Sequence, residues 1–185
     1  MLPSFAATRS RPWAVRIVAI AAAVVLVSVS ARLTIELGTP VPFTLQPLAV
    51  LLVALLLGGR DAATSLFTYV GLIALGAPLD ARGLGTAALF GPTGGFLVGF
   101  IVAAGLVGWL AERRGMSSVL RLLAALLGVA VIYLFGASFL MLVGNLSLAK
   151  AWQVGVLPFV GWDMLKAVVA VGLVEGMRRI GTRWL

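Results

Sequence analysis

The chain of 185 residues contains no cysteine and no histidine. It therefore forms no disulfide bond, has no thiolate nucleophile or imidazole general base, and lacks the usual ligands of a zinc site. Charged residues are scarce as well, at 11 % of the chain, against about 25 % in ordinary soluble proteins. These absences exclude most hydrolytic and redox chemistry, and we expect a protein that holds no metal and is not an enzyme.

A phosphate-binding loop is also absent. Its pattern, GxxxxGK[ST], requires a lysine directly after the second of two spaced glycines. The only lysines are Lys150 and Lys166, and neither follows glycines at that spacing. We therefore expect that the chain does not hydrolyse ATP by itself.

Apolar residues are abundant instead. They make up 62 % of the chain, and the mean hydropathy is +1.14. Several apolar runs are long enough to cross the ~30 Å hydrocarbon core of a bilayer, which predicts a multi-pass protein of the cell membrane. The net charge is +8, but the basic residues lie between the apolar runs, so we interpret them as topology determinants and contacts to anionic lipids. This placement excludes a nucleic-acid partner.

Six apolar runs predict an all-α fold with six transmembrane helices in a single domain over residues 1–185. They cover residues 13–31, 45–57, 61–77, 92–111, 119–143 and 158–177. The second run makes only ~20 Å of helix, so we expect it to begin in the preceding loop, to tilt, or to lie behind its neighbours. The first run also resembles a signal peptide, because Arg9, Arg11 and Arg16 precede its apolar core; an uncleaved helix is the simpler interpretation.

The basic residues orient these spans. Counted by loop, ten arginines fall on one side: Arg9, Arg11, Arg16, Arg60, Arg113, Arg114, Arg121, Arg178, Arg179 and Arg183. Arg32, Arg82 and Lys150 fall on the opposite side, and Lys166 lies within the sixth run. The positive-inside rule then places both termini in the cytoplasm. Three longer segments face outward, as a lid or as simple connectors: residues 32–44, 78–91 and 144–157.

Spans two, four and six begin on the outer side, and proline stands at or near the start of each. Proline suits the first turn of a helix, where its missing N–H is not needed. Helix N-termini carry partial positive charge, so three converging ends would attract an anion. The prolines are Pro42, Pro47, Pro92 and Pro158.

The sixth run contains Asp163 and Lys166, an i, i+3 pair on one helix face within an otherwise apolar segment. Charges inside a membrane helix are expensive and commonly mark function. One interpretation is a self-neutralising ion pair that only locates the helix in the bundle. The other is a site for a ligand with both an anion and hydrogen-bond donors, in which Lys166 meets the anion and Asp163 accepts from the donors.

Other residues near the same end have two interpretations each. A group of aromatic residues either walls a pocket or forms an interfacial belt: Phe43, Phe90, Phe96, Phe159 and Trp162. Gly94 and Gly95 predict a close approach of the backbone to a ligand or to another helix. In the first run, Ala19 and Ala23 permit close helix packing, either within the bundle or with a partner protein.

Several short segments occur in one order along nearly the whole chain. They are Val41–Gln46 (VPFTLQ), Leu56–Gly58 (LLG), Gly91–Phe96 (GPTGGF) and Leu157–Phe159 (LPF), followed by Asp163 and Lys166. In this order they resemble the BioY family, the biotin-specific S components of energy-coupling factor (ECF) transporters. The resemblance implies an S-component bundle with both termini inside and an outward-facing pocket, which captures biotin from the outer side for uptake.

The resemblance also implies residue roles and partners. Asp163 would bond the ureido ring of biotin and Lys166 its carboxylate, and the remaining ligand-binding candidates are Gln46, Thr93, Phe96, Phe43 and Arg82. A membrane coupling (T) protein and two cytoplasmic ATPases would supply the energy, with Ala19 and Ala23 as candidate partner contacts. Biotin is then the transported ligand, and no cofactor is expected.

Two departures from the family pattern stand out. The segment 78–83 is more charged than the Gly-rich form of the family, so that Arg82 becomes a candidate second cation, and Phe96 stands where tyrosine is common. Two other functions remain as alternatives. One is a stand-alone secondary vitamin transporter. The other, an intramembrane enzyme using Asp163 and Lys166 as acid and base, lacks a nucleophile elbow, a zinc pair or a carboxylate dyad.

Overall fold

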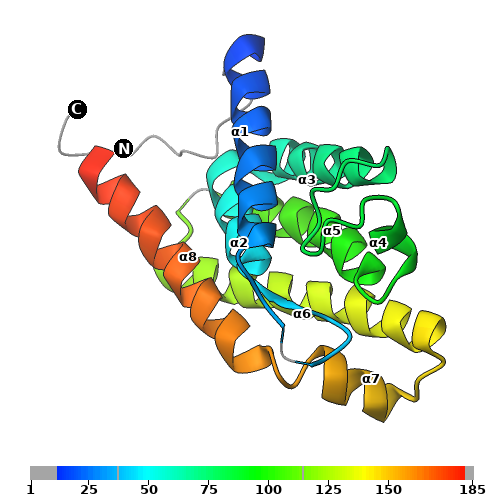
Figure 1. The fold of residues 1–185 in the computed structure, drawn as a ribbon. Coiled ribbons are helices and arrows are strands. Elements are labelled where there is room, and N and C mark those ends of the chain that lie inside the picture. Colours follow the sequence, from blue (N-terminus) through cyan, green and yellow to red (C-terminus); the bar gives the residue numbers. More distant parts are fainter. Residues whose placement is uncertain (1–11, 37, 114, 182–185) are drawn as a thin grey trace.

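A computed structural model describes residues 12–36, 38–113 and 115–181. Within this part of the chain there are eight helices and one hairpin of two short strands (Figure 1). The elements in chain order are α1 Trp13–Arg32, β1 Thr34–Ile35, β2 Phe43–Thr44, α2 Gln46–Leu57, α3 Gly59–Ala74, α4 Ala87–Phe90, α5 Gly94–Ala111, α6 Ser118–Gly144, α7 Leu148–Gly155 and α8 Val160–Gly181. Each of the six predicted runs overlaps one helix of at least 12 residues, although α3 begins two residues before and ends three residues before its predicted run. The hairpin, α4 and α7 were not predicted.

Not all six long helices could cross a bilayer on their own. By length and composition, α1, α5 and α6 are candidate spans among the described residues, and α7 with α8, which meet at an angle of 54°, make a fourth. The helices α2 and α3 have 12 and 16 residues, or roughly 18 and 24 Å, less than the hydrocarbon thickness. The described chain is therefore a mostly helical membrane protein with three or four candidate spans.

Helix α5 is central to the bundle, with α6, α3 and α2 packed around it. Its glycines allow this contact: a Cβ on Gly95 would overlap Phe139 of α6, and one on Gly94 would overlap the backbone at Leu89. Of the two interpretations of this glycine pair, the structure favours close approach to other protein segments. Gly136 of α6 likewise makes room for the ring of Phe96.

Helix α1 is packed on one side only. It contacts α2 and α3, and its N-terminal half extends beyond them in Figure 1. Ala23 is buried within the chain and Ala19 is half-buried, so packing inside the bundle accounts for Ala23. The opposite face, with Val18 and Val25, is exposed.

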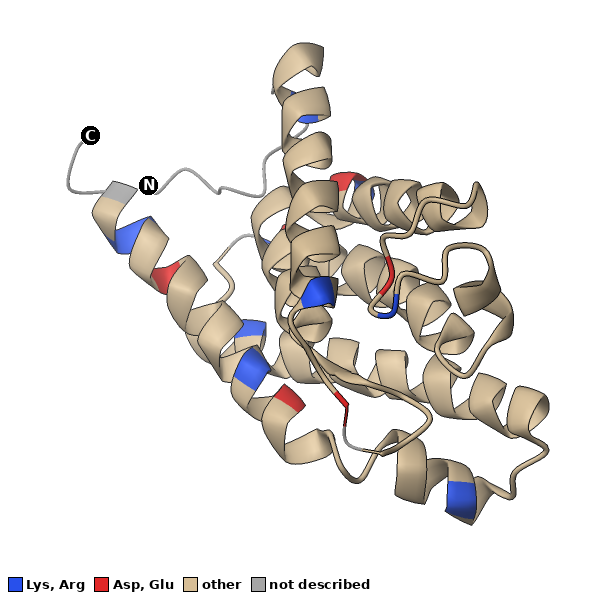
Figure 2. Cartoon of the chain, viewed as in Figure 1, with Lys and Arg blue, Asp and Glu red and all other residues tan. Residues whose placement is uncertain are grey.

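Charged positions are sparse along the helices (Figure 2). Two ion pairs join helices away from the hairpin: Arg16 of α1 bonds Asp61 of α3, and Arg121 of α6 bonds Glu175 of α8. They secure α1 and α8 to the bundle. Four arginines used to orient the spans lie outside the described residues: Arg9, Arg11, Arg114 and Arg183.

Candidate functional site

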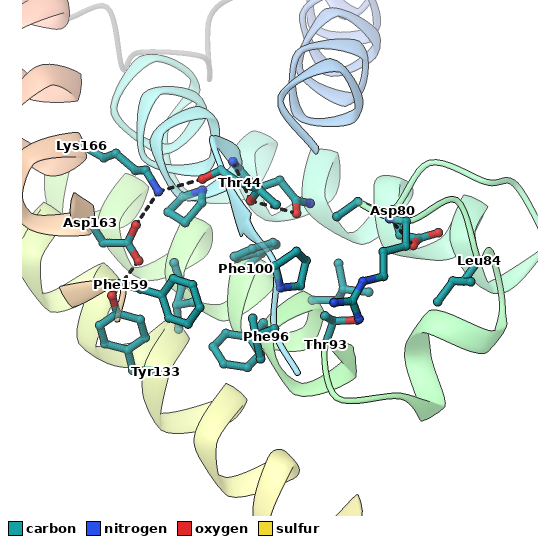
Figure 3. A pocket seen from close by; sticks show the side chains of 18 residues that line it. Thr44, Asp80, Leu84, Thr93, Phe96, Phe100, Tyr133, Phe159, Asp163 and Lys166 are labelled. Atoms are coloured by element: carbon teal, nitrogen blue, oxygen red, sulfur yellow. Dashed lines mark hydrogen bonds and ion pairs between the residues drawn. The ribbon is translucent and has the colours of Figure 1, made fainter. Parts of the chain in front are cut away.

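A pocket lies between helices α2, α5, α6 and α8, next to the hairpin and the loop that joins α3 to α4. Its atom-free space is about 660 Å³, counting its opening to the outside. In Figure 3, Asp163 and Lys166 lie at one end, Asp80 and Leu84 at the other, and three phenylalanines between them. The pocket therefore has two polar ends joined by an apolar middle.

The first polar end is built on Asp163 and Lys166 of α8. The Lys166 Nζ donates to Asp163 Oδ1 and to the carbonyl oxygen of Thr44, each at 2.7 Å. The Tyr133 hydroxyl of α6 donates to Asp163 Oδ2 at 2.6 Å. Lys166 and Asp163 are only 7 % and 4 % exposed. Because every charged group has a partner, both ions can stay in this buried place.

This first end keeps bonding capacity for a ligand. An ammonium has three N–H donors and a carboxylate has about four acceptor positions. Lys166 uses two donors, and each oxygen of Asp163 accepts one side-chain hydrogen bond. Among the described residues, this leaves one donor of Lys166 and two acceptor positions of Asp163. The ring of Phe43 lies 4.0 Å from Nζ and holds the ammonium from a further side through a cation–π contact.

A chain of hydrogen bonds closes the pocket wall beside this end. The Gln46 Nε2 at the start of α2 donates to the Tyr69 hydroxyl at 2.9 Å, and this hydroxyl donates to the Leu79 carbonyl at 3.1 Å. The Thr44 hydroxyl lies 3.3 Å from Gln46 Oε1. Gln46 thus connects the hairpin, α3 and the following loop, and its side chain is partly committed to that structure.

The second polar end belongs to the α3–α4 loop. Asp80 is buried and accepts two backbone N–H bonds, from Gly85 at 2.8 Å and from Arg82 at 3.1 Å. The Arg82 guanidinium reaches the hairpin region, where Nε and Nη2 bond the two oxygens of Glu36 at 2.9 and 2.8 Å, and Nη1 bonds the Pro40 carbonyl at 3.1 Å. Through this hydrogen bond, Arg82 lowers the pKa of Glu36 below its ordinary value.

Aromatic and aliphatic side chains form the middle of the pocket. Phe96 and Phe100 come from α5, Phe159 precedes α8, and all three are buried. Phe90 and Trp162, which were also predicted as wall residues, are 74 % and 58 % exposed and do not line the pocket. For these two residues, the interfacial interpretation fits better than the pocket interpretation.

The structure brings most of the predicted ligand-binding candidates to one pocket. Its lining includes Asp163, Lys166, Gln46, Thr93, Phe96 and Arg82. Phe43 is not part of the lining and touches the site through Lys166. Thr93 also bonds the Ala88 carbonyl at 3.3 Å, so its hydroxyl holds α4 as well as facing the pocket.

Sequence reasoning missed three polar lining residues: Thr44, Asp80 and Tyr133. Tyr133 did carry a signal, because it is one of only two tyrosines in the chain and lies in the middle of a long apolar run. A buried hydroxyl in such a place needs a partner, and Asp163 is the partner. Within the described residues no cluster of His, Cys, Asp and Glu side chains is suited to hold a metal ion.

Comparison with known proteins identifies the family. The model of the BioY family matches residues 5–183. The chain is 39 % identical over 158 residues to the biotin transporter BioY of Rhizobium etli, with 80 % of this chain and 84 % of that protein covered. It is 40 % identical over 156 residues to the biotin transporter BioY of Thermotoga maritima, with 84 % and 90 % covered.

A solved structure agrees with this result. The crystal structure of the S-component for biotin from an ECF-type ABC transporter matches with a TM-score of 0.83 and 25 % identity, over 90 % of this chain and 92 % of that chain. The chain therefore belongs to the BioY family.

Proposed function

We infer that this member of the BioY family is a biotin-binding S component of an ECF transporter and serves the uptake of biotin. The observation that carries the inference is the pocket, in an S-component fold, with a buried donor–acceptor pair at one end, aromatic walls in the middle and a guanidinium at the other end. The chain is a transporter component, as its relatives are, and is not an enzyme.

The chemistry of biotin matches the sequence of surfaces in this pocket. Its ureido ring presents two N–H donors and one carbonyl acceptor, its sulfur-containing ring and aliphatic chain are apolar, and its far end is a carboxylate. Asp163 and Lys166 together offer acceptors and one donor, which is the complement of a ureido group. We propose that they bind this group, with Gln46, Thr93 and Phe96 as wall contacts.

The family resemblance implied that Asp163 meets the ureido ring and Lys166 the carboxylate. Lys166 Nζ lies 2.7 Å from Asp163 Oδ1, whereas an aliphatic chain and a ring separate the two polar groups of biotin. An extended ligand cannot bring both its ends to one pair of touching side chains. We therefore propose that the pair binds one end as a unit and that Arg82, at the loop end of the pocket, meets the carboxylate.

We further propose six membrane-crossing helices with both termini in the cytoplasm. Supporting this topology, each of the six predicted runs overlaps one helix, and the predicted loops lie between these helices. The short helices α2 and α3 pack against α5, α1 and each other, so neighbouring helices cover much of their surface. The pocket then opens outward, since it lies beside the hairpin and the α3–α4 loop.

The energy source would be a separate coupling protein of the membrane with two cytoplasmic ATPases. This proposal is supported by the missing phosphate-binding loop and by the exposed apolar face of α1. Ala19, which is half-buried, stays a candidate for contact with such a partner at the edge of that face. A stand-alone carrier would instead move biotin in vesicles that contain this chain alone.

Calorimetric titration of biotin into the purified protein tests the proposed function. We expect tight binding, and binding weakened about tenfold or more by Asp163→Asn, which keeps the shape but removes the charge at the ureido site. Thermal unfolding of each variant would serve as the folding control. A folded wild-type protein that does not bind biotin would overturn the proposal.

A further inference from the structure

Arg82 is shared between the pocket and the hairpin region. Arg82 is one of the residues that line the pocket, and Glu36 occupies the side edge of its guanidinium, formed by Nε and Nη2. The Pro40 carbonyl takes one hydrogen of Nη1. A guanidinium has five N–H donors in a fixed fork, so one hydrogen on Nη1 and one on Nη2 remain. These two N–H groups can donate to a second carboxylate.

The charges around these N–H groups do not favour an anion. Arg82 contributes one positive charge, while Glu36 and Asp80 contribute one negative charge each, and both carboxylates are hydrogen-bonded to Arg82, Glu36 to its side chain and Asp80 to its backbone. Among the described lining residues, the other cation is Lys166, at the opposite end of the pocket. A ligand carboxylate that accepts from the remaining N–H groups of Arg82 would therefore lie beside a carboxylate already bound there, and the two would repel each other.

We propose that Glu36 is a specificity-determining residue, which competes with the carboxylate of the ligand for Arg82. This inference rests on the proposed function and on the assignment of Arg82 to the carboxylate end. Glu36 thereby reduces the preference of the pocket for biotin over neutral derivatives that lack the carboxylate charge. In the ligand-free protein, Arg82 links the α3–α4 loop to the hairpin region. When the ligand is bound, Arg82 is shared between Glu36 and the ligand carboxylate.

A purely structural role of Glu36 predicts a different result. If Glu36 only ties the hairpin to the α3–α4 loop, its loss loosens the entrance for every ligand. Biotin and a neutral derivative would then lose affinity by the same factor. The ratio of the two dissociation constants, rather than either constant alone, separates the roles.

The test is titration of biotin and of biotin amide into the full chain and its Glu36→Gln variant. The amide side chain keeps an acceptor for Arg82 but removes the competing charge. We expect the ratio of the dissociation constants, amide over acid, to rise about three- to tenfold, because the pair is partly exposed and its charges are screened. An unchanged ratio, or equal weakening of both ligands, would overturn the proposal.

Three further variants complete the design. Glu112→Gln removes a carboxylate that bonds Gly59 N at 3.1 Å, away from the pocket, and should leave the ratio unchanged. In an Arg82→Gln background, Glu36→Gln should no longer raise the ratio, and a rise there would also contradict the competition. Glu36→Ala should raise the ratio too and replaces Glu36→Gln if that variant does not fold.

Two failures can be told apart. Absence of biotin binding in the wild type would contradict the proposed function, whereas normal binding with an unchanged ratio would contradict this inference alone.

Discussion

The two polar ends of the pocket are built on ion pairs of opposite character. At the helix end, Lys166 and Asp163 have side chains 8 % and 5 % exposed. At the loop end, Arg82 and Glu36 have side chains 33 % and 53 % exposed. A buried pair is strongly destabilising to break, because the ion left behind has no water, whereas an exposed pair contributes little to stability. The helix end should therefore be rigid and the loop end able to exchange partners.

The local structure explains this difference. Asp163 and Lys166 are one turn apart on α8, so the helix itself holds them together. Arg82 and Glu36 are 46 residues apart and lie outside the helices. Their contact therefore depends on how the tertiary fold places the α3–α4 loop next to the segment between β1 and β2. A ligand that binds between the ends thus meets one preformed group and one group that must be shared.

Breaking the buried pair should have the largest effect. In Lys166→Met, Asp163 keeps only the Tyr133 hydroxyl as a side-chain partner among the described residues, so we expect a loss of about 3–5 kcal/mol in stability and about 100-fold weaker biotin binding. The double variant Asp163→Asn, Lys166→Met removes both charges. It should recover much of the stability without recovering binding, as measured by thermal unfolding and titration. Recovery of binding in the double variant would show that the pair is only structural.

Replacing either of the two tyrosines should have a smaller effect, and the two variants should differ in what they change. Tyr133→Phe leaves one oxygen of Asp163 without its donor, so we expect about tenfold weaker biotin binding. Tyr69→Phe breaks the bonds to Gln46 and to the Leu79 carbonyl, and should lower stability by about 1–2 kcal/mol with less than about threefold change in affinity. Titration and thermal unfolding of both variants measure the contrast. Equal losses of affinity in the two variants would contradict the expectation that the Tyr133 hydroxyl supports ligand binding and the Tyr69 hydroxyl supports mainly the fold.

What could be predicted from the sequence follows the same division between local and distant contacts. The six helices and the Asp163–Lys166 pair were predictable, since hydropathy and i, i+3 spacing act within one segment. The bond from Lys166 to the Thr44 carbonyl joins residues 122 positions apart. A backbone carbonyl has no signature in the sequence, so nothing pointed to this contact.

The site residues that the sequence did not reveal were missed for similar reasons. Tyr133 meets Asp163 from another helix, and Asp80 is held by backbone N–H groups of its own loop. The strands of the hairpin have two residues each, too few to produce an alternating pattern. Arg82 was predicted as a second cation from its charge, but its partner Glu36 was not, because loop pairing depends on the tertiary fold.

Acidification should affect the loop end of the ligand-free protein in a distinct way. Because Arg82 lowers the pKa of Glu36 from its ordinary 4.5, the stabilising contact is fully present above pH 4.5 and is lost as the pH falls through the lowered value. Hydrogen exchange of the amides in residues 33–36 and 38–45 should therefore speed up as the pH falls below 4.5, relative to exchange in helix α5, which serves as the internal reference. Glu36→Gln carries no titrating group there and should show no such step. An identical step in that variant would assign the acid sensitivity to another carboxylate and would leave the Arg82–Glu36 contact too weak to hold the hairpin.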